Sequence, residues 1–212
     1  ASVQEMYDLT MLAFDLAEFY RIPAMILGDA VVGQMKEPLI PHPRPDRKLP
    51  AKDWALRGTE DGEQRVVKSL YLGDGELEAH NWKLYAKYRE LAEKESRWED
   101  FETSDATLIV TGFGSAARIA KTAVMMAREE GMKVGLLRPI TLFPFPEKAF
   151  ASVTERCKKV LDIELNTGQM VEDVRLSVAR DAEVYFYGRP SGTGSLPTPE
   201  ELLEQIRFYY RK

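Results

Sequence analysis

The second half of the chain alternates between short apolar runs and longer segments in which apolar residues recur every three or four positions. The short runs predict strands, and the longer segments predict helices. The predicted strands are 106–112, 133–137, 159–165 and 183–188, and the predicted helices are 115–131, 144–159, 168–181 and one that begins after Thr198. Strands that alternate with helices pair in parallel through right-handed crossovers. We therefore predict an α/β fold with a doubly wound parallel sheet of at least four strands.

The first residues predict a helix followed by one strand. Ser2 and Glu5 can form a capping box, and apolar residues at helical spacing follow them. Residues 24–29 are typical of a short buried strand. A helix and a single buried strand cannot cover both faces of a sheet, so we expect the chain to begin inside a domain.

A proline-rich segment lies between the two halves. Residues 37–50 contain five prolines, which favour extended chain and predict a linker. A long helix is then predicted from Glu76 to about Phe101, with one apolar stripe and a charged remainder. The charges are typical of a solvated face.

Four loops follow the carboxyl ends of the predicted strands, where doubly wound sheets meet ligands and partners. They span 112–115, 138–146, 166–170 and 188–194. In the first, Gly112, Gly114 and Ser115 fit a Gly-x-Gly-x-x-Ala fingerprint that can hold a phosphate at a helix start. The second strand ends in Arg138 and not in the acid that binds a ribose, so a tight strand-to-helix turn is the alternative.

The third loop is more polar than a turn requires. Gly168 allows a sharp bend, and the amides of Asn166 and Gln169 can bond donors and acceptors across a gap. One hypothesis is that this loop fixes its domain against another domain or subunit. The alternative is that the side chains satisfy the backbone of the turn itself.

Composition narrows the function classes. Acidic side chains number 34 and basic ones 29, so no strong field draws the chain to nucleic acid or to an anionic membrane. No apolar stretch approaches the roughly 20 residues of a membrane span. The single cysteine excludes an internal disulfide, and also an iron–sulfur cluster or cysteine zinc site built by this chain alone. We expect a soluble, cytoplasmic protein.

Other chemically active residues are isolated. Residues 73–75, Gly-Asp-Gly, look like the start of a thiamine diphosphate motif, but Asn81 is too close to complete its magnesium site, which favours a turn. His42 and His80 have no second metal ligand at useful spacing. Cys157 is typical of a packed thiol. We therefore predict no metal site and no catalytic residue.

Several collinear runs resemble the alpha subunit of 2-oxoacid:ferredoxin oxidoreductases. The runs similar to its domain II, which is transketolase C-terminal-like, begin ATLIVTGFGSAARIAK at 106, ELNTGQMVEDVR at 164 and YFYGRPSGTG at 185. Residues 2–29 and 33–41 are similar to the last part of its domain I. WALRG, SLYL and LEAHNWKLYAKY resemble the connecting segment of the 2-oxoisovalerate, or branched-chain, type.

The resemblance implies a reaction and a set of partners. In that family a 2-oxoacid and coenzyme A become acyl-CoA and carbon dioxide, while electrons pass through iron–sulfur clusters to ferredoxin. Thiamine diphosphate supplies the carbanion chemistry. A beta subunit holds the diphosphate and magnesium, and a ferredoxin-like subunit carries the clusters. We expect none of these cofactors to be bound by this chain alone, and a homodimer remains open.

The family's residues transfer only in part. Its Tyr-Pro-Ile-Thr-Pro-like segment and the glutamate that contacts the pyrimidine ring correspond to positions before Ala1, so no catalytic residue is carried over. The domain II residues that do match are interface or cleft candidates: Asn166, Thr167, Gly168, Gln169, Met170 and Arg138, with Pro139, Phe145 and Pro146.

The resemblance also divides the chain and leaves two rivals. Residues 1–40 would be a helix–strand remnant of domain I, 41–104 the linker and connecting helix, and 105–212 domain II. The first rival is a noncatalytic assembly module of another thiamine-dependent enzyme. The second is a dinucleotide-binding enzyme that uses the loop at 112–115.

Overall fold

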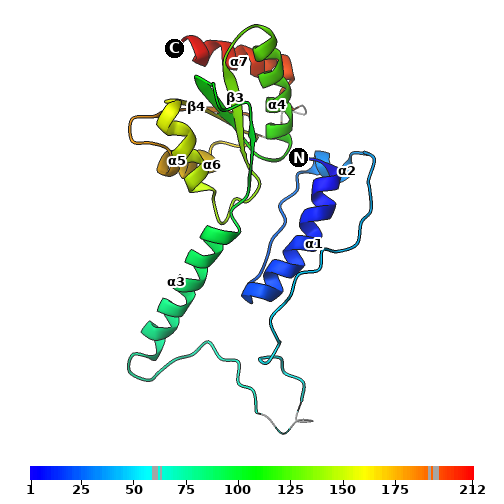
Figure 1. Cartoon of the computed structure of the whole chain (residues 1–212), viewed down its shortest axis with the longest axis vertical. Coiled ribbons are helices and arrows are strands. Elements are labelled where there is room, and N and C mark those ends of the chain that lie inside the picture. Colours follow the sequence, from blue (N-terminus) through cyan, green and yellow to red (C-terminus); the bar gives the residue numbers. More distant parts are fainter. Residues whose placement is uncertain (59–61, 63, 191, 193–195) are drawn as a thin grey trace. The chain divides into compact units, whose positions relative to one another are not determined.

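The computed structural model describes residues 1–58, 62, 64–190, 192 and 196–212 (Figure 1). These residues form two compact units. The sheet unit comprises residues 1–3, 28–36 and 91–212, and the helical unit comprises residues 4–27 and 37–90. Part of the predicted loop at 188–194, namely residues 191, 193 and 194, lies outside the described residues. None of the helices in the described ranges is long and apolar enough to cross a membrane.

The sheet unit is built on five strands in the order β1-β3-β2-β4-β5. Four of them pair in parallel and confirm the predicted doubly wound sheet, while β1 pairs antiparallel with β3 at one edge. The strands are β1 (Trp98–Phe101), β2 (Leu108–Thr111), β3 (Val134–Pro139), β4 (Lys159–Glu164) and β5 (Glu183–Gly188). The chain passes from β2 to one neighbour, β3, and then to the other neighbour, β4. The strand order therefore reverses between β2 and β4, which is where such sheets open toward ligands or partners.

Helices cover both faces of the sheet (Figure 1). The helices of this unit are α2 (Ala30–Gln34), α4 (Gly114–Glu129), α5 (Glu147–Arg156), α6 (Met170–Ser177) and α7 (Pro199–Arg211). Helices α4 and α7 pack on the face that buries Leu108 and Val110, and α5 and α6 pack on the face that buries Ile109. The alternation arises because successive residues of a strand point to opposite faces. The predicted cap of α7 is confirmed, since Thr198 accepts from the Glu201 amide in a capping box.

The helical unit contains α1 (Val3–Tyr20) and most of α3 (Glu76–Lys94). The proline-rich segment runs along α1, where the Tyr7 hydroxyl donates to the His42 carbonyl at 2.8 Å. Lys52 and Glu18 form an ion pair at 2.8 Å. Polar side chains of α1 thus anchor an extended segment that forms no ladder of its own.

Two predictions about the first half are wrong. Residues 24–29 form no strand, because the described part of the chain offers no neighbour with which they could pair, and Met25 and Leu27 are exposed. The long helix ends at Lys94 and not near Phe101, because Trp98–Phe101 leave it to pair with β3 as β1. Trp98 fits the helical spacing of apolar residues, which is why the predicted helix extends too far.

Candidate functional site

The loop after β4 is closed by its own asparagine. The Asn166 side chain donates to the Glu164 carboxylate at 2.9 Å and accepts from the Gly168 amide at 2.7 Å. Gly168 has a positive φ of 102°, and a Cβ there would lie 3.1 Å from the ring of Phe186. Both the backbone conformation and the close approach therefore require glycine.

Glu164, the last residue of β4, caps the helix that follows. Its carboxylate is fully buried and accepts from the amides of Gln169 at 3.1 Å and of Met170 and Val171 at 3.0 Å. These amides begin α6 and have no partner within the helix. Burial alone would raise the pKa of Glu164, but the side chains of Asp162 and Asn166 and the amides outweigh it and hold that pKa below its usual value.

A second carboxyl group lies beside the first. Asp162 is fully buried two residues earlier on β4, and in the parallel register it lies beside Thr111 of β2. Burial and the neighbouring Glu164 carboxylate raise the pKa of Asp162 to about 9. Thr111 Oγ1 and both carboxyl oxygens of Asp162 have no hydrogen-bond partner within the described residues.

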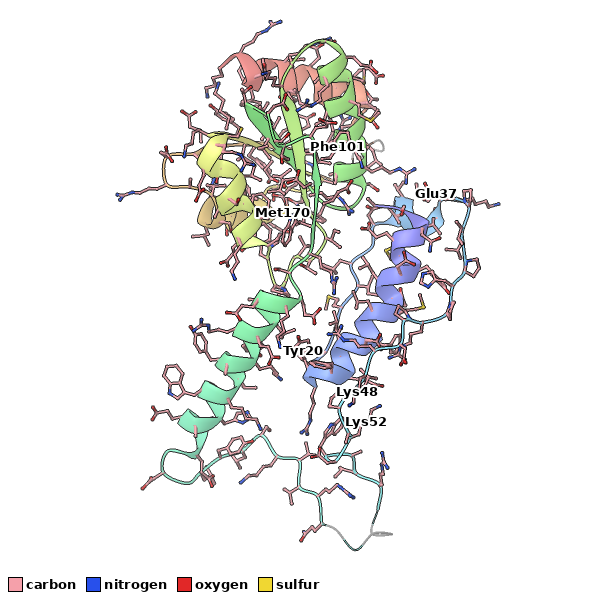
Figure 2. The ribbon with its side chains drawn as sticks, in the orientation of Figure 1. Tyr20, Glu37, Lys48, Lys52, Phe101 and Met170 are labelled. Atoms are coloured by element: carbon pink, nitrogen blue, oxygen red, sulfur yellow. The ribbon has the colours of Figure 1, made fainter. Side chains whose placement is uncertain are left out.

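The structure separates the loop candidates into two groups. Asn166 and Gly168 serve the turn, and Met170, the first residue of α6, is buried in the core with side chains of α5 (Figure 2). Thr167 and Gln169 are exposed, and their side chains make no hydrogen bond with any residue that the structure describes. Among the loop candidates 166–170, these two side chains are the exposed ones.

The glycine loop after β2 is occupied by a carboxylate of the chain. Oδ2 of Asp29 accepts from the Ser115 amide at 3.0 Å, at the start of α4, while Oδ1 accepts from Val31 and Val32 at the start of α2. Burial raises the pKa of Asp29, but these donors outweigh it and lower that pKa overall. One carboxylate thus caps two helices. The amide of Ser115, where a phosphate would bind, already has an anionic partner.

The two glycines of this loop are explained by close contacts. A Cβ at Gly112 would lie 2.8 Å from the Ile163 carbonyl of β4, and one at Gly114 would lie 3.1 Å from Asp29 Oδ2. Gly114 also has a positive φ of 55°. These contacts favour the tight turn over the dinucleotide fingerprint, whose phosphate role stays a prediction.

We expect replacement of Asp29 by Ala to loosen residues 28–36 from the rest of the sheet unit. Loss of one N-cap costs about 1 kcal/mol, and Asp29 caps two helices, so the free energy of unfolding should fall by about 1–2 kcal/mol. Amide hydrogen exchange at Val31, Val32 and Ser115 measures the effect. Glu129→Ala, an exposed change on α4, is the control. Unchanged exchange at all three amides would contradict the capping role.

Arg138 does not join the polar loop. Its guanidinium bonds Glu99 of β1 at 2.7 Å, and Glu99 also pairs with Lys121 of α4. Burial raises the pKa of Glu99, but these two cations outweigh it and lower that pKa. Arg138 therefore lies on the face that α4 covers, while Glu164 lies on the opposite face and caps α6.

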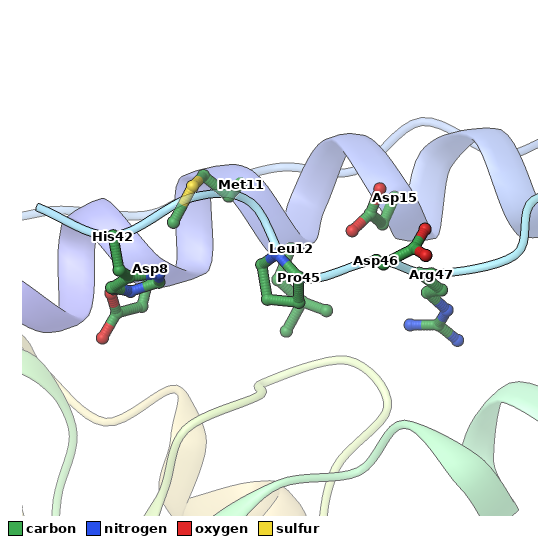
Figure 3. Close-up of a pocket in the computed structure, with 8 residues that line it drawn as sticks. All are labelled: Asp8, Met11, Leu12, Asp15, His42, Pro45, Asp46 and Arg47. Carbon is green, nitrogen blue, oxygen red and sulfur yellow. The ribbon is translucent and has the colours of Figure 1, made fainter.

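The remaining candidates have structural roles. Residues 73–75 form the turn that begins α3, and Cys157 is a buried thiol. In the helical unit, His42 bonds Asp8 at 2.8 Å beside a pocket of about 410 Å³ (Figure 3). The Pro43 carbonyl and the Asp8 carboxylate raise the pKa of His42. Within the ranges that the structure describes, no three His, Cys, Asp or Glu side chains could hold a metal ion together.

Sequence reasoning missed the residues on which the loop depends. Asp162 and Glu164 were read only as members of an apolar run, although two carboxylates inside a buried strand are rare and are usually paired. That anomaly could have identified them. Asp29 gave no comparable indication, because its contact with Ser115 links positions 86 residues apart.

Comparisons with known proteins identify the sheet unit. Residues 106–202 match the family model of pyruvate:ferredoxin oxidoreductase core domain II. The chain is 45% identical over 184 residues to ketoisovalerate oxidoreductase subunit VorB of Methanothermobacter marburgensis, which covers 86% of this chain and 52% of that subunit. It is 42% identical over 208 residues to VorB of Methanothermobacter thermautotrophicus, and this match covers 98% of the chain and 58% of that subunit.

A solved structure has the same fold. It is the 2-oxoglutarate:ferredoxin oxidoreductase from Magnetococcus marinus with 2-oxoglutarate, coenzyme A and succinyl-CoA bound, at a TM-score of 0.77 and 20% identity. The match covers 99% of this chain and 41% of that chain. Residues 106–202 are therefore a core domain II of the pyruvate:ferredoxin oxidoreductase family, and the whole chain is a relative of the alpha-type subunits of 2-oxoacid:ferredoxin oxidoreductases.

Proposed function

We propose that these 212 residues are part of the alpha subunit of a 2-oxoacid:ferredoxin oxidoreductase that acts on a branched-chain 2-oxoacid such as 2-oxoisovalerate. The complex would convert the 2-oxoacid and coenzyme A to acyl-CoA and carbon dioxide and reduce ferredoxin. The observation that carries the proposal is the 42–45% identity to the two VorB subunits along 86–98% of the chain. The chain spans little more than half of those subunits, and we assign the activity to the assembly as a whole.

Within that assembly we assign this chain a structural role. An iron–sulfur cluster needs several thiolates, and the chain has one cysteine, which is buried. The described residues also offer no cluster of metal-binding side chains. A single buried thiol does not fit the clusters of the reaction, and we place the clusters and the magnesium on partner subunits. In the same proposal residues 1–40 belong to domain I, 41–104 connect, and 105–212 form domain II.

Copurification tests this assignment. A tag on the full-length native protein should bring down a thiamine-binding subunit and a cluster-bearing subunit in equal amounts. Recovery of a different thiamine-dependent enzyme would favour the assembly-module alternative. Recovery of the protein without partner subunits would favour the dinucleotide alternative if the purified protein also binds NAD or NADP saturably.

We further propose that the loop after β4 is a docking element near the cofactor cleft. Its position supports this, because the strand order reverses between β2 and β4 and loops at such a point face ligands or partners. Its side chains support it too: Thr167 and Gln169 are exposed without a partner, while Asn166 and Glu164 hold the backbone beneath them. The loop is thus rigid at its base and open at its tip.

A double replacement, Thr167→Ala with Gln169→Ala, should weaken assembly without weakening the fold. We expect at least a tenfold loss of affinity for the partner subunits. Removal of the two side chains would leave the polar groups that they contact on the partner buried and unpaired. The free energy of unfolding of the chain should change by less than about 0.5 kcal/mol, as for other surface changes. Titration of the partner subunits followed by analytical ultracentrifugation measures the affinity.

Gln205→Ala is the matched amide control, because Gln205 lies on α7, on the opposite face of the sheet. It should leave assembly unchanged. If the double variant assembles as tightly as the control, the loop serves only its own turn.

A further inference from the structure

Two carboxyl groups are buried side by side in β4. Asp162 and Glu164 are both fully buried, and residues two apart on a strand point to the same face. Glu164 accepts hydrogen bonds from three backbone amides and from the Asn166 side chain, while the two oxygens of Asp162 accept none within the described residues. The environment therefore favours a negative charge on Glu164 far more than on Asp162, whose charged form is supported only weakly, by the Ile163 amide and by Arg175.

The surroundings of Asp162 are otherwise almost uncharged. Its register partners are Thr111 on β2 and Phe186 on β5. From α6, Arg175 favours the charged form, but its effect is smaller than those of burial and of Glu164. From α5, the side chains buried on this face are uncharged: Ala149, Phe150, Val153, Thr154 and, just after the helix, Cys157.

We propose that Asp162 is protonated at neutral pH beside an ionised Glu164, and that this pair is the positioning element of the loop after β4. Two neighbouring carboxyl groups at fully buried positions on one face of a strand do not both ionise readily, so one proton remains on the pair at neutral pH. The amides bound to Glu164 place that proton on Asp162. A neutral Asp162 then supports a charged Glu164, which holds the amides of residues 169–171 and, through Asn166, the turn.

The contribution of Asp162 to the stability of the fold should decrease as the pH rises. The pKa of Asp162 is raised to about 9 from an unfolded value near 3.8, so the folded chain binds more protons than the unfolded chain between these values. The contribution of Asp162 to stability is complete below about pH 4 and is lost as the pH rises toward 9. Above pH 9 two charges would face each other, and we expect the cap of α6 to loosen.

Asp162→Asn tests the proposal in the 212-residue chain. Asparagine mimics the neutral carboxylic acid, so the loop should keep its structure. The proton release of Asp162 and the pH dependence that it causes should disappear. Between about pH 4 and 9 the unfolding equilibrium constant of the native chain should rise relative to that of the variant, by up to tenfold per pH unit. Asp173→Asn is an exposed change on α6, and the pH profile of its unfolding equilibrium constant should run parallel to that of the native chain. Parallel profiles for Asp162→Asn as well would overturn the proposal.

A measurement on the unaltered chain covers the case in which the variant does not fold. Carbon-13 NMR of the side-chain carboxyl groups should show Asp162 titrating above pH 7 and Glu164 remaining ionised at neutral pH. The amide resonances of Gln169, Met170 and Val171 should move with the same midpoint as Asp162. An Asp162 carboxyl that is ionised at pH 6 would refute the proposal. The result is independent of whether the loop docks, because no partner subunit is present.

Discussion

Replacement of Glu164 by Ala is expected to lower the free energy of unfolding of the sheet unit by about 3 kcal/mol or more. The variant leaves the amides of Gln169, Met170 and Val171 without an acceptor and removes the partner of the Asn166 side chain. Buried donors without acceptors each cost about 1–3 kcal/mol. The loss should therefore exceed that of an ordinary helix cap, which is about 1 kcal/mol.

Urea unfolding of the native chain and the variant measures this loss. Glu172→Ala is the matched control, because Glu172 is an exposed glutamate in the first turn of the same helix. The control should change the free energy of unfolding by less than about 0.5 kcal/mol. The loss in free energy of unfolding for Glu164→Gln should lie between those for Glu164→Ala and Glu172→Ala, since an amide oxygen still accepts hydrogen bonds but carries no charge. Equal losses for Glu164→Ala and Glu172→Ala would show that the buried carboxylate does not hold the loop.

The second large effect concerns cofactor binding and activity. We expect the isolated 212-residue chain not to bind thiamine diphosphate tightly and not to reduce ferredoxin with any 2-oxoacid. The barrier of such a reaction is lowered by groups preorganised around the cofactor, and we place those groups on the rest of the alpha subunit and on its partners. Addition of the remaining parts should restore acyl-CoA formation from an undetectable level.

Calorimetry with thiamine diphosphate and magnesium on the isolated chain measures the binding. The complete complex, titrated under the same conditions, is the positive control. Saturable binding in the micromolar range by the chain alone would place the cofactor site within these residues. The assignment of a structural role to this chain would then be wrong.

Most of the sheet unit could be predicted from the sequence because its central strands are continuous apolar runs and its helices carry apolar residues at helical spacing. The strand predicted at 183–188 has the same bounds as β5, and the cap at Thr198 begins α7 as expected. The edge strand β1 could not be predicted. Its four residues are half exposed, and their pairing with β3 depends on positions almost 40 residues later.

The sequence predicts the polar loop after β4 but not the contacts that hold it. The sequence located the loop because Asn166, Gly168 and Gln169 are unusual between a buried strand and a helix. It could not show which side chains hold the turn, because that depends on whether Glu164 points toward the amides of α6. Asn166 satisfies the turn itself, whereas the exposed Gln169 side chain makes no hydrogen bond with the described residues, and its role in docking stays a prediction.

Turnover by the complete native complex tests the central proposal most directly. The complex, purified through a tag on the full-length protein, would be assayed for 2-oxoacid-dependent and coenzyme A-dependent reduction of ferredoxin. Three substrates would be compared: 2-oxoisovalerate, 2-oxoglutarate and pyruvate. The proposal predicts that kcat/KM is highest for 2-oxoisovalerate, with no reduction when coenzyme A is omitted. A higher kcat/KM for 2-oxoglutarate or pyruvate would contradict the substrate, and no reduction with any of the three would contradict the function.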